Sequence, residues 1–108
     1  MEIKYIDKNC IITPLSPRLD KREVNRLISE LAENNLSKIG LNLDFVKDCT
    51  IDFFENLKSK EISLFNVPSD IFSLLNIMNY TKEFTIYANE IDFLDNKREI
   101  INRKFQIV

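Results

Sequence analysis

The spacing of apolar residues switches repeatedly along this chain between a period of two and a period of 3.6, and this limits the fold more than any other feature. Five segments have the pattern and length of strands: 2–7, 10–14, 39–45, 62–67 and 83–88. Four amphipathic segments follow or separate them, beginning near Asp20, Ile51, Ile71 and Asn89. The predicted order is β-β-α-β-α-β-α-β-α, in a chain of 108 residues that fits one domain, 1–108.

This order predicts how the strands are arranged. Strands separated by helices are joined by right-handed crossovers and run parallel, whereas the opening pair forms an antiparallel edge. The segments 39–45 and 83–88 alternate between apolar and polar residues, with Ile86 on the apolar face and Tyr87 on the polar one. Strands buried on both faces are apolar throughout. We therefore expect an α/β fold with a mixed, mostly parallel sheet and helices mainly on one face.

The ends of the predicted helices carry capping residues. Asp20 with Glu23 has the spacing of a capping box, and an apolar stripe follows it on the first helix. Either Asp48 or Thr50 can cap the second helix. Asn89 is expected to begin a fourth helix that extends into 96–103. The stripe of the first helix consists of Val24, Leu27, Ile28 and Leu31.

The composition excludes several classes of function. With 15 basic and 17 acidic residues the net charge is −2, so no overall field favours nucleic acid or an anionic membrane. The chain has no histidine, which removes the commonest general base and every Ser-His or Cys-His pair. Its one glycine, Gly40, lies in mid-strand, so no glycine-rich loop is available to cradle a phosphate. We therefore expect no enzymatic activity and no cofactor.

Cysteine spacing and hydropathy predict the compartment. Cys10 and Cys49 fall in different predicted elements and match no metal-ligand spacing, so we expect no metal site. No apolar run approaches the ~18 residues that a membrane span needs. The opening residues do not resemble a signal peptide. These features predict a cytoplasmic protein that keeps both thiols reduced and does not insert into a membrane.

Two short motifs carry a family resemblance. Pro17-Arg18-Leu19-Asp20 precedes the first predicted helix, and Asp48-Cys49-Thr50 lies where the third strand passes into the second helix. Together with the order of elements across residues 1–95, they resemble the STAS domain, a family that includes the bacterial anti-sigma factor antagonists. That family has Gly-x-Leu-Asp at the first place and Asp-Ser-Ser/Thr-Gly-Leu at the second. The resemblance implies a cytoplasmic signalling module in transcription regulation, with residues 96–108 as an extension of uncertain packing.

The second motif departs from the family pattern at its switch. The resemblance places the phosphorylated serine at Cys49, and a thiol is not a substrate for a Ser/Thr kinase. Thr50 lies one position along, turned by about 100° on a helix. Pro17 and Ile51 stand where the family has glycines, and both are conformationally restricted. The usual phosphoswitch is therefore expected to be lost.

Cys49 itself has two interpretations. A cysteine at a helix N-terminus can be a reactive thiolate, because the helix dipole lowers its pKa. Asp48 and Asp52 flank it with negative charge, which opposes that shift. The alternative is a small, partly buried residue that is tolerated where the switch has been lost.

The resemblance also implies a partner-binding face around the second motif. Asp20 and Asp48 keep the family's carboxylates there, although both are equally well explained as helix caps. Phe53 and Phe54 are 100° apart on a helix, so either one of them is exposed or both straddle a wide core stripe. The candidate apolar contacts are Leu15, Pro17, Val46, Ile51 and Phe53.

We therefore predict a non-enzymatic protein-interaction module that resembles an anti-sigma factor antagonist and binds a kinase-type anti-sigma factor or a related regulator. The alternative is a subunit of a lipid ABC-type transporter or of a signalling scaffold, and a third hypothesis is a thiol-based redox protein. The thin basic cluster in 97–104 is typical of a solvated helix end, so we expect no nucleic-acid partner. The apolar residues of the tail 96–108 either cover the core or pair two copies of the chain through an edge strand, which would give a homodimer.

Overall fold

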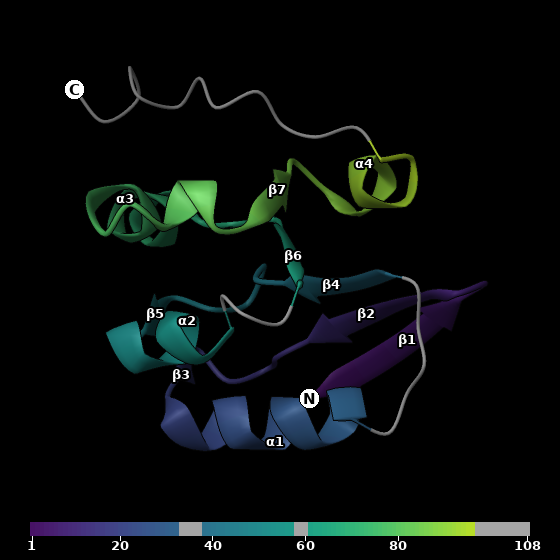
Figure 1. Ribbon diagram of the computed structural model, residues 1–108, viewed down its shortest axis with the longest axis horizontal. Coiled ribbons are helices and arrows are strands. Elements are labelled where there is room, and N and C mark those ends of the chain that lie inside the picture. The colour runs from purple at the N-terminus through teal and green to yellow at the C-terminus, as the bar shows by residue number, and fades with distance from the viewer. Residues whose placement is uncertain (33–37, 58–60, 97–108) are drawn as a thin grey trace.

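The computed structural model describes residues 1–32, 38–57 and 61–96, and five of its strands form one sheet in the order β1-β2-β4-β6-β7 (Figure 1). β1 and β2 pair antiparallel, and the remaining neighbours pair parallel. The predicted α/β fold with a mixed sheet and an antiparallel N-terminal edge is thus confirmed. The strands of this sheet are β1 (Glu2–Ile6), β2 (Asn9–Thr13), β4 (Lys38–Asn42), β6 (Ser63–Phe65) and β7 (Thr85–Tyr87).

The helices begin close to where the sequence places them. Asp20 caps the first helix as predicted, because its Oδ1 accepts the backbone N–H of Arg22 at 3.0 Å. Asn89 caps the fourth, because its Oδ1 accepts the N–H of Asp92 at 2.9 Å. The helices are α1 (Lys21–Ala32), α2 (Ile51–Leu57), α3 (Ser69–Ile77) and α4 (Glu90–Leu94), with the 3-10 turn η1 (Tyr80–Lys82) before β7.

The main core lies on the face of the sheet that α1, α2 and α3 cover. Val24 and Leu27 of the predicted stripe on α1 are buried in it, and Ile28 packs against it. The side chain of Leu31 lies outside the described residues. Aromatic rings connect α2 to the turn before β7, since the ring centroid of Phe54 is 5.9 Å from that of Phe84. Three helices on one face agree with the predicted arrangement.

The second face of the sheet is less polar than the sequence predicts. The alternation in 83–88 placed Tyr87 on a polar face, but Tyr87 is only 5% exposed and lies in a second core cluster with Ile11, Phe65 and Phe93. Phe93 comes from α4, which folds back over this face. Its ring stacks on Phe65 at a centroid distance of 5.4 Å. One short helix therefore makes the second face partly apolar, which the strand pattern alone did not indicate.

Two lysines hold α4 in place at its two ends. Lys4 of β1 forms an ion pair with Glu90 in the first turn, with Nζ–Oε2 3.0 Å. Lys38 of β4 donates a hydrogen bond to the carbonyl of Phe93 at the other end. Its ammonium also lies 4.3 Å from the centroid of the Phe93 ring. A cation near the carbonyl end of a helix is favourable through the helix dipole.

The fourth helix is shorter than the sequence predicts. It ends at Leu94, with Asp95 as its C-cap, and Asn96 follows in the left-handed region at φ 60°. A residue with positive φ cannot continue a right-handed helix. The predicted extension of this helix into 96–103 is therefore wrong at its first residue. The rest of the C-terminal extension, 97–108, lies outside the described residues.

Candidate functional site

A second, two-stranded sheet forms at the strand-to-helix junction that the sequence singled out. β3 (Arg18–Leu19) and β5 (Asp48–Cys49) pair in parallel. The carbonyl of Pro17 accepts the backbone N–H groups of Lys47 at 2.7 Å and Asp48 at 3.0 Å. The two motifs behind the family resemblance are thus hydrogen-bonded side by side, although neither segment was predicted to be a strand.

Side chains alternate across this pair of strands, as in any β-ladder. Arg18 and Asp48 point outward, whereas Leu19 and Cys49 point into the core. Arg18 Nε lies 3.7 Å from Asp48 Oδ2, and the two side chains are 69% and 66% exposed. So exposed a pair contributes little to stability. It does place one positive and one negative group at the surface, where a partner can reach both.

The position of the family's phosphorylated serine faces inward. Cys49 is 6% exposed, and both cysteines of the chain are buried thiols. Burial, with a smaller contribution from the charge of Asp48, raises the pKa of Cys49 to about 12. The thiol is therefore protonated at neutral pH. The reactive-thiolate interpretation is not supported, since desolvation dominates at this short helix.

Thr50 is no better placed to accept a phosphate. Its Oγ1 is buried, and it has no hydrogen-bond partner among the described residues. Thr50 precedes α2, and its backbone carbonyl accepts the N–H of Phe53 at 3.2 Å. The hydroxyl therefore does not cap the helix, contrary to one of the two options that the sequence left open. Neither Cys49 nor Thr50 presents its side-chain heteroatom to a kinase in this conformation.

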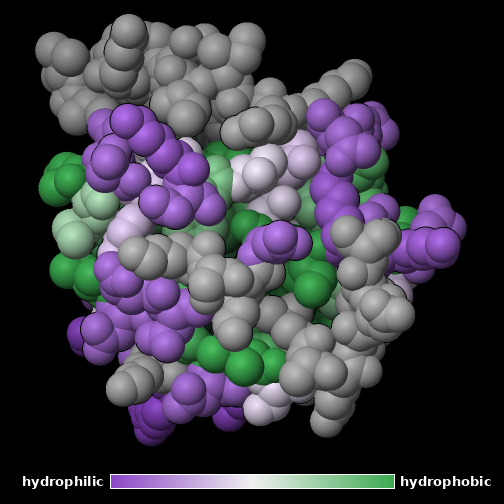
Figure 2. Space-filling model, in the orientation of Figure 1, coloured by the Kyte–Doolittle hydropathy of each residue, from purple (hydrophilic) through white to green (hydrophobic). Residues whose placement is uncertain are grey.

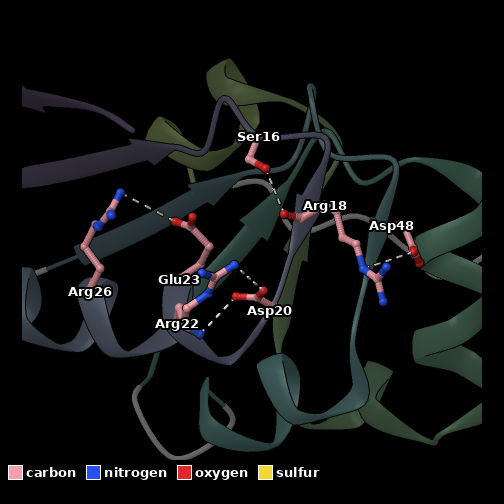
Figure 3. Close-up of polar contacts among 7 residues, drawn as sticks. All are labelled: Ser16, Arg18, Asp20, Arg22, Glu23, Arg26 and Asp48. Carbon is pink, nitrogen blue, oxygen red and sulfur yellow. Dashed lines mark hydrogen bonds and ion pairs between the residues drawn. The ribbon is translucent and has the colours of Figure 1, made fainter.

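The resemblance implied that Asp20 and Asp48 belong to one partner-binding face, and in the structure their side chains have different partners. Figure 3 shows Asp20 at the start of α1, directed toward Arg22, while Arg18 of β3 and Asp48 of β5 point toward each other. Desolvation acts to raise the pKa of Asp20. The opposing effects of the backbone N–H groups of Arg22 and Glu23 and the charge of Arg22 leave it lower than usual. Capping accounts for Asp20 without a partner.

The candidate apolar contacts divide into exposed and buried residues. Leu15 is 53% exposed and Ile51 is 46% exposed. Pro17 is also exposed. Val46 and Phe53, in contrast, are each 1% exposed and belong to the main core. Both phenylalanines of α2 therefore face inward, the second of the two options for Phe53, and Val46 and Phe53 are not surface contacts.

Phe45 is a surface residue that the sequence interpretation missed. The N–H of Val46 bonds to the carbonyl of Leu43 at 3.1 Å, and the N–H of Asp44 bonds to Asn42 Oδ1 at 3.1 Å. The chain therefore turns after Leu43, which leaves Phe45 53% exposed at the corner. Asn42 and Asp44 could have indicated this turn in the sequence, because Asn and Asp favour turns of this kind.

We call the exposed side chains on and next to the two short strands the ribbon surface. It combines apolar groups with the exposed Arg18–Asp48 ion pair, and acidic Asp44 and Asp52 neighbour its residues in the sequence. On the face drawn in Figure 2, hydrophobic areas are separated by hydrophilic ones, so no continuous apolar layer dominates that view. The ribbon surface consists of Leu15, Pro17, Arg18, Phe45, Asp48 and Ile51.

Comparisons with known proteins do not add a family. No family model matches this chain, and no curated protein matches it. Within the described ranges, no three His, Cys, Asp or Glu side chains gather as a metal site would need. The helices in those ranges are all too short or too polar to cross a bilayer.

Proposed function

We propose that this chain is a non-enzymatic, cytoplasmic protein-interaction module of the anti-sigma factor antagonist type, and that it binds a kinase-type anti-sigma factor or a related regulator through the ribbon surface. The observation that carries the proposal is the parallel pairing of β3 with β5. It brings the two STAS-like motifs together and leaves apolar and charged side chains exposed beside them. Aromatic and aliphatic groups near charged side chains match the composition of binding surfaces, in which an apolar centre has a polar rim.

In this proposal, binding does not depend on phosphorylation. Cys49 and the hydroxyl of Thr50 are both buried, so the positions that correspond to the switch are not available to a kinase. A partner would therefore be bound constitutively, or be controlled by its own state. The central contacts would be Phe45 and Ile51, because truncating an aromatic or large aliphatic group in the middle of an interface costs the most affinity.

The test is affinity purification from the native cell lysate with tagged wild type, Phe45→Ser, Asp48→Lys and Ile77→Ser, followed by identification of bound proteins by mass spectrometry. Ile77 is the matched control, because it is 79% exposed but lies on α3. We expect an ATP-binding anti-sigma kinase to co-purify with the wild type and with Ile77→Ser, and to be lost from the other two variants. Retention of that partner by Phe45→Ser and Asp48→Lys would contradict the ribbon surface as its site.

Once the partner is identified and purified, isothermal titration calorimetry gives the dissociation constant of the complex. We expect Phe45→Ser to raise the dissociation constant by about tenfold or more. Incubating the pair with ATP tests the switch, because intact mass should show no phosphate on this chain. Phosphorylation at Thr50 would show that the segment opens and that the switch has moved.

A subunit of a lipid ABC-type transporter or of a signalling scaffold is the second candidate. The burial of Cys49 and of the Thr50 hydroxyl favours it equally, because the switch serine is often dispensable in those members of the family that the chain resembles. The same purification separates the two candidates. A transporter ATPase or permease that depends on Phe45 would support the second candidate and exclude the first.

A further inference from the structure

We propose that two copies of this chain pair through the outer edge of β1, in an antiparallel register that places Glu2 of each copy opposite Lys4 of the other. β1 forms one edge of the five-stranded sheet, and among the described strands it pairs only with β2 (Figure 1). Edge strands of this kind are templates for pairing with another chain. The ribbon surface takes no part in this pairing, so the dimer and the proposed function stand or fall separately.

The hairpin determines which backbone groups of β1 point outward. Ile6 pairs with Asn9 across a two-residue turn, and the pairs then continue in register along the hairpin. In such a hairpin the pair next to the turn is hydrogen-bonded, and bonded and non-bonded pairs alternate after it. Every second residue before Ile6 is therefore in a bonded pair. Lys4 and Glu2 accordingly direct their N–H and C=O groups toward β2. Ile3 and Tyr5 direct theirs away from β2, toward the side of β1 that pairs with no other described strand.

Pairing between identical strands has to obey twofold symmetry. The outward N–H and C=O groups of Ile3 then exchange hydrogen bonds with those of Ile3 in the second copy. A residue that precedes Ile3 in one copy lies opposite the residue that follows Ile3 by the same number of positions in the other. Glu2 of one copy therefore lies opposite Lys4 of the other, twice in the dimer. The Glu2–Lys4 pairs are non-hydrogen-bonded positions of the antiparallel ladder, at which opposing side chains approach most closely.

The charges of β1 select this register over its neighbour. If the twofold axis passed through Lys4, two ammonium groups would oppose each other, and like charges directly opposite are destabilising. In the register centred on Ile3, each ammonium meets a carboxylate. Lys4 already binds Glu90 of its own α4, with Nζ–Oε2 3.0 Å, on the same side of the sheet. It would therefore lie between two carboxylates, one from each copy.

The opposite side of β1 contributes apolar contact. Ile3 is half-buried and packs against the main core, so the two Ile3 side chains would extend that core across the junction. A strand of five residues buries a small area, so we expect a weak dimer with a concentration-dependent population. The result is a continuous sheet across both copies.

Sedimentation velocity over a range of concentrations tests the pairing with Glu2→Lys, Lys4→Glu and an equimolar mixture of the two. Each variant alone places like charges opposite each other in its own dimer. We expect each to raise the dimer dissociation constant by about tenfold or more. The mixture restores opposite charges at both positions, so dimers should return as mixed pairs. Lys82→Glu, an exposed charge change on η1, is the control and should leave the dimer unchanged.

Three outcomes would overturn the proposal. One is a wild type that stays monomeric at every concentration, the second is a dimer that neither charge change weakens, and the third is a mixture that does not recover. Circular dichroism of each variant confirms folding. Lys4→Glu also breaks the contact with Glu90, whereas Glu2→Lys leaves it intact. If Lys4→Glu fails to fold, the result with Glu2→Lys is therefore the test.

Discussion

The ring of Phe93 lies directly on Gly40: a β-carbon built on Gly40 would be 2.7 Å from Cε1 and Cζ of that ring. The ring cannot move aside easily, because it stacks on Phe65 and meets Tyr87 edge-on at a centroid distance of 5.6 Å. The single glycine of the chain is thus explained by a close approach rather than by backbone conformation.

We expect Gly40→Ala to lower the free energy of unfolding by about 1–3 kcal/mol, the usual cost of overpacking a core. Urea denaturation followed by circular dichroism measures it. In a Phe93→Leu background the added methyl group has room, so the same change should cost much less there. Equal costs in both backgrounds would show that the contact with Phe93 is not the cause.

The hydroxyls of Thr50 and Thr13 provide a matched pair. Thr50 Oγ1 is buried without a hydrogen bond among the described residues, whereas Thr13 Oγ1 accepts one from Asn42 Nδ2 at 3.3 Å. We expect Thr50→Val to leave stability unchanged or to raise it by up to about 1 kcal/mol, and Thr13→Val to lower it by about 1 kcal/mol. A loss on Thr50→Val would mean that the hydroxyl has a partner in solution.

Asp20 and Asp48 should separate stability from binding. Asp20 caps α1, so Asp20→Ala is expected to lower the urea midpoint clearly. The ion pair that Asp48 forms with Arg18 is exposed, so Asp48→Ala should change stability by less than about 0.5 kcal/mol while weakening the binding of the partner. The pKa of Asp20 is lowered, so its contribution is complete above its ordinary pKa of 3.8 and is lost as the pH falls through the lower folded value. Equal stability losses from both variants would contradict this division.

Cys49 should behave as a buried thiol. We expect iodoacetamide at neutral pH to label it only as fast as the protein opens, and rapidly in urea, as read by peptide mass spectrometry. Its pKa rises from 9.0 to about 12 on folding, so the stabilisation from its burial is complete below pH 9 and is lost as the pH rises toward 12. Comparison with Cys49→Ala isolates that loss from other titrations. Fast labelling of the folded protein would revive the redox interpretation.

Much of the fold could be predicted because it depends on local patterns. Cap residues such as Asp20 and Asn89 act within a few positions of themselves. The apolar phase of Leu41 and Ile86 follows directly from strand alternation. Phe45 was predicted to continue the same alternation as Leu41 and instead lies at the surface, because Asn42 and Asp44 turn the chain first.

The sequence by itself determined the order of the longer strands and the helices, and the parallel sheet with its antiparallel edge, since these depend on residue type and short-range period. Only the tertiary structure decided that β3 pairs with β5, that Cys49 is buried with a raised pKa, and that Tyr87 lies beneath Phe93. The physical reason is that these properties come from hydrogen bonds and packing between distant segments, such as Pro17 with Asp48, and no local pattern encodes them.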